Sequence, residues 1–339
     1  MKNRRNFIFV CLCIFLLTSC VDQQDHAGLI LYKSTDPFIY NFARQIETYA
    51  DGTLELEVFD SKNSQILQNE QILEAQLGEV TDLMIINPVD RLSSYAIINK
   101  QRELEIPVIF FNREPLQKDL ALWEDAYYVG AKAEQSGQLQ AELIMELFGS
   151  NPYELNEHDR NGDGVIQALI LKGEPGHQDA EIRSEEVVKV FNKQGYTIDT
   201  LVEVANWERG QAYENMDDIL QDYGNQIEVI LSNNDAMAIG AIQRMRESGF
   251  FTDTNGNGQI DPSDENWIPV VGIDGIAEAV GLIKEGFLYG TVINDSDVQA
   301  QAIIELSEFI LGKRSSADFS FELVADSYIW VDYKVFTLE

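Results

Sequence analysis

Short polar side chains recur directly after the predicted strands of this sequence, and their types suit a ligand rich in hydroxyl groups. Carboxylates and amides can hold hydroxyls through paired hydrogen bonds, because each hydroxyl both donates and accepts. At any one position the alternative is a turn residue or a helix cap. Recurrence after several strands favours a crevice for a neutral polyhydroxylated molecule. The residues are Asp36, Asn112, His177, Asp179, Asn233, Asn234, Asp235, Asp274 and Asn294.

Two aromatic residues, Phe38 and Trp207, are candidates for stacking against such a ligand. The C–H faces of a hexose are apolar and lie flat on aromatic rings, which bury area at low entropic cost. The alternative for each ring is an ordinary place in a hydrophobic core.

The elements that must position these residues alternate between short β-rich runs and amphipathic helical stretches. Leu83–Ile86 and Val108–Phe111 are continuous apolar runs, typical of parallel strands buried on both faces. One predicted helix, residues 64–77, carries an apolar stripe of Ile66, Ile72, Leu73 and Leu77. Two consecutive βαβ series predict an α/β fold of two doubly wound parallel-sheet lobes. Ligands of such sheets bind beyond the carboxyl ends of the strands, where the polar side chains lie.

Several motifs together resemble the bacterial galactose/glucose-binding proteins, which are type I periplasmic binding proteins of ABC sugar importers. The motifs are F-F-N-R-E-P (Phe110–Pro115), A-Y-Y-V-G (Ala126–Gly130), L-K-G-E-P-G-H-Q-D-A-E-I-R (Leu171–Arg183), N-N-D-A-M-A-I-G (Asn233–Gly240) and G-T-V-I-N-D (Gly290–Asp295). The resemblance covers nearly the whole chain after its N-terminal segment. It implies the sugar ligands Asp36, Phe38, Asn112, His177, Asp179, Arg183, Trp207, Asn234, Asp274 and Asn294.

The resemblance also implies an organisation and a mechanism. A three-segment hinge would join an N-terminal lobe (29–132 plus 295–328) to a C-terminal lobe (133–294 plus 329–339). Hinge closure around D-glucose or D-galactose would create the form that the permease recognises. Asp36 would accept from the 4-hydroxyl, whose orientation distinguishes the two sugars, and the protein would be a monomer.

The run D-R-N-G-D-G-V-I-Q has the start of an EF-hand-type calcium loop. Oxygen ligands stand at alternate positions, with glycine at the sharp turn. The predicted ligands are Asp159, Asn161, Asp163, the Val165 carbonyl and Gln167. Position twelve is Ile170 rather than an acid, and the family resemblance implies that Glu228 supplies the missing carboxylate. The alternative is a plain Asp/Asn/Gly turn.

A second run, D-T-N-G-N-G-Q-I-D-P-S-D, fills all six loop positions and predicts a second calcium site. Its ligands would be Asp253, Asn255, Asn257, Gln259 (through its carbonyl), Asp261 and Asp264. Aspartate at the last position reaches less far than the usual glutamate.

The first twenty residues have the layout of a secretory signal: basic Lys2, Arg4 and Arg5, a short apolar run, then L-T-S-C. This end resembles a lipoprotein processing box, which predicts a lipidated Cys20 and a linker at 21–28 on an extracytoplasmic, membrane-anchored protein. The alternative is ordinary cleavage nearby. Cys11 and Cys13 lie inside the signal, so no intrachain disulfide is expected.

The chain is strongly acidic, with 57 Asp and Glu against 24 Lys and Arg over 339 residues. Such a surface repels phosphate backbones and excludes nucleic acid as a partner. A glycosidase would need a carboxylate pair at a set separation, yet no nucleophile motif, phosphate loop or catalytic metal signature occurs, and we expect no enzyme. A sensor that presents sugar to a chemoreceptor or membrane kinase remains an alternative to import.

Overall fold

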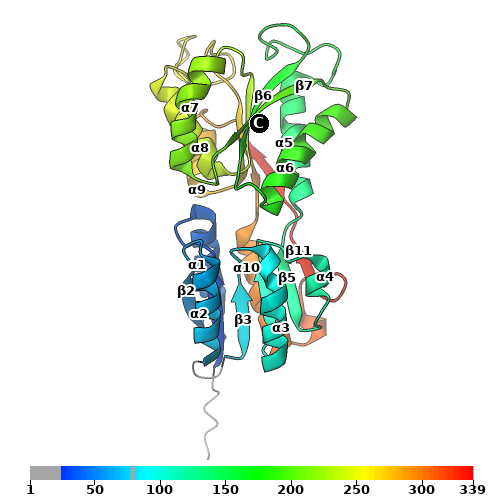
Figure 1. Ribbon diagram of the computed structural model, residues 1–339. Coiled ribbons are helices and arrows are strands. Elements are labelled where there is room, and N and C mark those ends of the chain that lie inside the picture. Colours follow the sequence, from blue (N-terminus) through cyan, green and yellow to red (C-terminus); the bar gives the residue numbers. More distant parts are fainter. Residues whose placement is uncertain (1–23, 78–80, 339) are drawn as a thin grey trace, which may run out of the picture.

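The computed structural model describes residues 24–77 and 81–338, and Cys20, with the signal segment, lies outside them. The described chain folds into two lobes, stacked one above the other in Figure 1. Each lobe contains a six-stranded sheet. The predicted α/β class with two doubly wound lobes is therefore confirmed.

The N-terminal lobe has the strand order β11-β5-β4-β3-β1-β2, and all neighbouring strands run parallel. Helices pack on both faces, and α1 lies against α10, which returns from the C-terminal part of the chain. The elements are β1 (Asp25–Leu31), α1 (Pro37–Ala50), β2 (Leu54–Asp60), α2 (Gln65–Leu77), β3 (Leu83–Ile86), α3 (Ser94–Leu104), β4 (Val108–Phe111), α4 (Gln117–Leu120), β5 (Ala126–Gly130), α10 (Ser296–Ile310) and β11 (Tyr328–Trp330).

The C-terminal lobe repeats this plan with the order β12-β10-β9-β8-β6-β7, in which only the β10–β12 pair is antiparallel. Its elements are α5 (Ala133–Phe148), β6 (Ile166–Lys172), α6 (Gln178–Lys193), β7 (Ile198–Val204), α7 (Arg209–Tyr223), β8 (Val229–Ser232), α8 (Asp235–Glu247), β9 (Val270–Asp274), α9 (Ala277–Lys284), β10 (Gly290–Ile293) and β12 (Lys334–Thr337).

The central strands owe their place to continuous apolar sequence. Every residue of β3 and β4 is buried, as expected for parallel strands covered by helices on both faces. The stripe predicted on α2 is wrong in part: Ile72 is buried, but Ile66, Leu73 and Leu77 are exposed. Gln68 takes the inward position because its amide donates to the Asn87 carbonyl and its oxygen accepts from the Val89 N–H.

The chain passes between the lobes three times, after β5, after β10 and after β11. The third crossing differs from the expected boundary between 328 and 329, which would cut β11. Tyr328–Trp330 pairs with β5, so the crossing lies beyond Trp330 and only β12 belongs to the C-terminal lobe. Within residues 24–77 and 81–338, no helix has both the length and the apolar character that a bilayer crossing requires.

Candidate functional site

A cavity lies between the two lobes, at the carboxyl ends of their strands. Nine of the ten residues implied as sugar ligands line it, together with three that the sequence did not indicate. The N-terminal lobe contributes Tyr32, Asp36, Phe38, Ile39, Asn112 and Arg113, and the C-terminal lobe contributes His177, Asp179, Arg183, Trp207, Asn234 and Asp274. The cavity therefore exists only when both lobes are present.

Three of the lining residues also cap helices. Asp36 precedes α1 and accepts from the N–H groups of Phe38 and Ile39; Asn234 precedes α8 and accepts from that of Met237. His177 caps α6 by accepting from the Asp179 N–H through Nδ1. The capping alternative is thus correct at these positions, but it does not exclude a site, because a cap holds a side chain at the cavity wall.

The tenth residue, Asn294, does not line the cavity. It is buried directly after β10, where its backbone N–H donates to the Asp274 carbonyl at 3.1 Å. Its side-chain oxygen accepts from Gln299 at the start of α10. In this arrangement the backbone of Asn294 supports that of Asp274.

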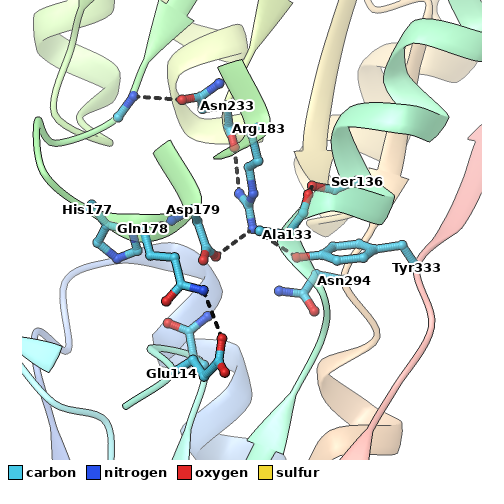
Figure 2. A network of polar contacts seen from close by, with 12 residues as sticks. Glu114, Ala133, Ser136, His177, Gln178, Asp179, Arg183, Asn233, Asn294 and Tyr333 are labelled. Atoms are coloured by element: carbon cyan, nitrogen blue, oxygen red, sulfur yellow. Dashed lines mark hydrogen bonds and ion pairs between the residues drawn. The ribbon is translucent and has the colours of Figure 1, made fainter. Parts of the chain in front are cut away.

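Arg183 is the centre of a buried network (Figure 2). Its guanidinium donates to the Asn233 carbonyl at 2.7 Å, the Tyr333 hydroxyl at 3.0 Å and the Asp179 carboxylate at 3.1 Å. Burial opposes its charge, but the nearby Tyr333, Asp179 and Asp274 outweigh burial and raise the pKa of Arg183. The Arg183 charge is thereby fixed, and it faces two carboxylates that point toward the same cavity.

The acids and the histidine of the C-terminal lobe respond to burial. Burial raises the pKa of Asp179, against the opposing charge of Arg183. It raises the pKa of Asp274 well above its usual range, with Asp235 and Asp36 adding to the rise. Burial and the neighbouring arginines lower the pKa of His177 well below its usual range. His177 is therefore neutral, and because Nδ1 accepts from the Asp179 N–H, Nε2 carries the proton and can donate to a ligand.

The two aromatic candidates come from opposite lobes. Phe38 is almost fully buried, packs edge-to-face on Phe42, and still reaches the cavity. Trp207 has a positive φ of 68° and lies over Gly173, where a Cβ would stand 2.3 Å from the indole ring. The glycine is required by this close approach. Both rings therefore pack in the hydrophobic core and also line the cavity.

Tyr32 and Arg113 are lining residues that sequence reasoning missed. The Tyr32 hydroxyl donates to Asp36, and the Arg113 guanidinium stacks 3.9 Å above the Tyr32 ring. Both lie just beyond the end of an apolar strand, as the recognised polar residues do. Arg113 directly follows the predicted ligand Asn112 within the F-F-N-R-E-P motif. This adjacency was the sequence signal that could have indicated Arg113 as a lining residue.

Contacts across the cleft hold the lobes together beside the cavity. Gln178 donates to Glu114 at 2.8 Å, and Arg113 lies 3.6 Å from the Glu174 carboxylate. On the other side, Lys33 pairs with Glu208. A second cavity opens past His177 and Asp179; its further lining includes Asn63, Asp90, Arg91, Glu114, Glu174 and Gln178. The main cavity therefore continues into a polar space between the lobes.

The first predicted calcium loop folds with its acids turned inward. Asp159 accepts from the N–H groups of Gly162 and Gly164, both at 2.9 Å. Glu228, directly before β8, is buried against the loop and accepts from the N–H groups of Arg160 and Gln167. A carboxylate from the neighbouring strand thus lies where the loop itself lacks one, and the oxygen donor set fits calcium.

The second loop closes in a similar way. Asp253 accepts from Gly256 and Gly258, and the last acid, Asp264, folds back to accept from the Thr254 N–H at 2.7 Å. Among the residues that the structure describes, no three His, Cys, Asp or Glu side chains gather as a metal cluster. Either loop would therefore need its amide and carbonyl oxygens as well.

Comparison with known proteins identifies the family. The model of the periplasmic binding protein domain matches residues 27–314. The chain belongs to the periplasmic binding proteins. A D-galactose/methyl-galactoside binding periplasmic protein of Haemophilus influenzae is 35% identical to this periplasmic binding protein over 318 residues, 91% of this chain and 90% of its relative. A putative rhizopine-binding protein of Rhizobium meliloti is 29% identical, covering 86% of this chain and 85% of that protein.

Solved structures share the fold of this periplasmic binding protein. One is an ABC transporter solute-binding protein of Actinobacillus succinogenes with bound D-allose, with a TM-score of 0.73 and 22% identity, covering 93% of this chain and 98% of that one. Another, from Bacillus halodurans with bound myo-inositol, has a TM-score of 0.72 and 23% identity, covering 93% and 94%. The resemblance noted from the motifs is confirmed at the level of the family. These relatives are extracytoplasmic solute-binding proteins, not enzymes.

Proposed function

We propose that this periplasmic binding protein captures a hexose, D-glucose or D-galactose, and delivers it to an ABC importer. The observation that carries the proposal is a cavity shared by both lobes, lined by Phe38 and Trp207 from opposite lobes and by three acidic side chains. Asp36, Asp179 and Asp274 can accept from hydroxyls, while Arg183 and neutral His177 can donate. A buried polar site of this kind rejects analogues that lack a hydroxyl.

The relative from Haemophilus influenzae supports this choice of ligand among the sugars and polyols bound in the family. Its name includes methyl-galactoside, and the polar space beyond His177 and Asp179 would accommodate a small glycosidic substituent. A methyl glycoside is therefore a second candidate ligand at the same site.

Calorimetric titration of the purified protein tests the proposal. D-galactose and D-glucose are expected to bind at one site per chain, and D-ribose and D-xylose, which lack the sixth carbon and its hydroxyl, more weakly. Asp274→Ala should abolish hexose binding, while Asp119→Asn, a buried acid of α4 away from the cavity, should leave it unchanged. Equal affinity for all four sugars, or none for the hexoses, would contradict the proposal.

We further propose that calcium stabilises the two loops of the C-terminal lobe. In the first, Asp159, Asn161, Asp163, the Val165 carbonyl, Gln167 and Glu228 would hold the ion; in the second, Asp253, Asn255, Asn257, the Gln259 carbonyl, Asp261 and Asp264 would do so. Ligand binding stabilises the folded state by mass action. Calcium should raise the melting temperature, and native mass spectrometry should count two ions per chain. A count of one would overturn the second site.

Lipidation of Cys20 would anchor the protein to the outer face of the cell membrane, close to its permease. Cys20→Ser should release the protein from the membrane fraction, and unchanged membrane association would contradict the anchor. Presentation of the sugar to a chemoreceptor or sensor kinase is compatible with the same closure.

A further inference from the structure

Asp274 differs from the other acids of the cavity in how its side chain is held. The Asp36 carboxylate accepts from Tyr32 and from two N–H groups of α1, and Asp179 pairs with Arg183. Among the described residues, none donates a hydrogen bond to the Asp274 carboxylate, although Asp274 is buried and lines the cavity. Its position is therefore set by its backbone.

That backbone is strained. Asp274 has a φ of 124°, a value that residues with a side chain rarely adopt, and Gly275 follows at 77°. Such conformations cost free energy and persist only where surrounding contacts impose them. Some feature of the C-terminal lobe must hold this turn after β9.

A fully buried carboxylate, Asp235, makes the contacts that hold it. Its Oδ2 accepts from the N–H of Gly275 at 2.7 Å and of Ile276 at 2.9 Å, the two residues that follow Asp274. Its Oδ1 accepts from the Thr291 hydroxyl at 2.7 Å in the neighbouring strand β10. On the other side, the Asn294 N–H donates to the Asp274 carbonyl at 3.1 Å.

The strands are shaped to admit this carboxylate. A Cβ at Gly272 would stand 2.0 Å from Asp235 Oδ1, so only glycine fits at this position of β9. Thr291 is the register partner of Gly272 in β10, so its hydroxyl lies beside the space that the glycine leaves. Asp235 itself is the first residue of α8, directly after the cap Asn234.

We propose that Asp235 is a positioning residue that fixes the strained Asp274 turn and so aims the Asp274 carboxylate at the sugar. The inference rests on the proposed hexose function and assigns to Asp235 no contact with the ligand, since Asp235 is not among the lining residues. Without the Asp235 acceptor, the N–H groups of Gly275 and Ile276 lose their partner and the turn can relax away from a φ of 124°.

The test compares Asp235→Leu, Asp235→Asn and Thr291→Val with Asp119→Asn as the matched control. Asp235→Leu should lower D-galactose affinity by ~100-fold, because two N–H groups are left unpaired. Asp235→Asn keeps one acceptor oxygen and should stay within ~10-fold, and Thr291→Val should fall between ~3-fold and ~10-fold. The control should bind as the parent does.

A set of mono-deoxy hexoses separates positioning from a general structural effect. In the parent, the sugar that lacks the hydroxyl facing Asp274 should bind weakly. In Asp235→Leu that particular penalty should shrink to less than ~3-fold, because the partner acid is no longer in place, while the other deoxy penalties persist. A uniform loss over all sugars would contradict positioning.

Three further outcomes would each overturn either this inference or the hexose proposal. A folded Asp235→Leu that binds galactose within ~2-fold of the parent overturns the inference. If that variant does not fold, unchanged affinity in both Asp235→Asn and Thr291→Val overturns it instead. If the parent protein binds no hexose, the proposed hexose function itself is overturned. Titration of the parent alone reveals that outcome, so it is distinguishable from a failure of the Asp235 inference.

Discussion

The two lobes share one architecture but offer different surfaces to the cavity. The C-terminal lobe contributes a buried network in which Arg183 links Asp179, Asn233 and Tyr333. The N-terminal lobe contributes a helix cap, Asp36, and a stacked pair, Tyr32 and Arg113. We expect the C-terminal surface to be fixed before a ligand arrives and the N-terminal surface to complete the site when the lobes close.

The lobes contact each other beside the cavity through the Gln178–Glu114 hydrogen bond and the Arg113–Glu174 and Lys33–Glu208 pairs. Lys33–Glu208 is partly exposed, and ion pairs of this kind contribute little to stability. Under the proposed function, a ligand held by both surfaces would supply the free energy that favours the closed form.

The largest effect should come from the C-terminal network. Arg183→Met leaves the Asp179 carboxylate buried without its partner, and removing one member of a buried pair costs ~3–5 kcal/mol. Hexose affinity should fall by at least ~100-fold and the melting temperature should drop. Calorimetry and thermal unfolding measure both, and near-normal affinity would show that the network does not preorganise the site.

The stability of the C-terminal lobe should depend on pH. Burial raises the pKa of Asp235 to about 7, against the hydrogen bonds from Thr291, Ile276 and Gly275. A raised carboxyl pKa means that the folded state binds more protons, so the Asp235 contribution to stability falls as pH rises from about 4 to about 7. Asp235→Asn removes this dependence.

Relative to the parent, the free energy of unfolding of Asp235→Asn should therefore rise by on the order of 2 kcal/mol between pH 5 and pH 8. Denaturant unfolding at the two pH values measures it. A difference between the two proteins that does not change with pH would contradict the prediction.

In the N-terminal lobe we expect a smaller change that alters selectivity. Asp36→Asn keeps an oxygen for the N–H groups of α1, so the fold should persist, but one charged acceptor is lost. Affinity should fall by ~10-fold, since hydrogen bonds to charged groups contribute ~1.5–3 kcal/mol. The ratio of galactose affinity to glucose affinity should change as well. If parallel titrations with the two sugars give an unchanged ratio, Asp36 does not discriminate between them.

The smallest effect should come from the contacts across the cleft. Gln178→Ala removes the hydrogen bond to Glu114 but no group that faces the main cavity. We expect a loss of less than ~3-fold in affinity. A loss as large as that of Arg183→Met would mean that lobe-to-lobe contacts, rather than the two surfaces, determine closure.

Local pattern was sufficient to predict the main strands. Leu83–Ile86 and Val108–Phe111 have the ends expected from their apolar runs, because a strand buried on both faces leaves a continuous signal. The stripe of α2 failed because a buried glutamine with satisfied hydrogen bonds, Gln68, looks polar in sequence. Periodicity does not report such partners.

The site was predictable only in part. Polar residues after strands indicated the cavity, the chemistry of a hexose made Phe38 and Trp207 stacking candidates, and the family resemblance supplied Arg183. Tyr333 was missed because its contact with Arg183 joins residues 150 apart in the chain, and β12 begins directly after it. The support of Asp274 by Asp235 requires the register of β9 and β10, which no local pattern contains.

A crystal structure with D-galactose tests the central claim most directly. The account predicts one pyranose ring between Phe38 and Trp207, with hydroxyls on Asp36, Asp179 and Asp274 and both lobes closed on it. An empty cavity in crystals grown with saturating sugar, or a sugar held by one lobe alone, would contradict it.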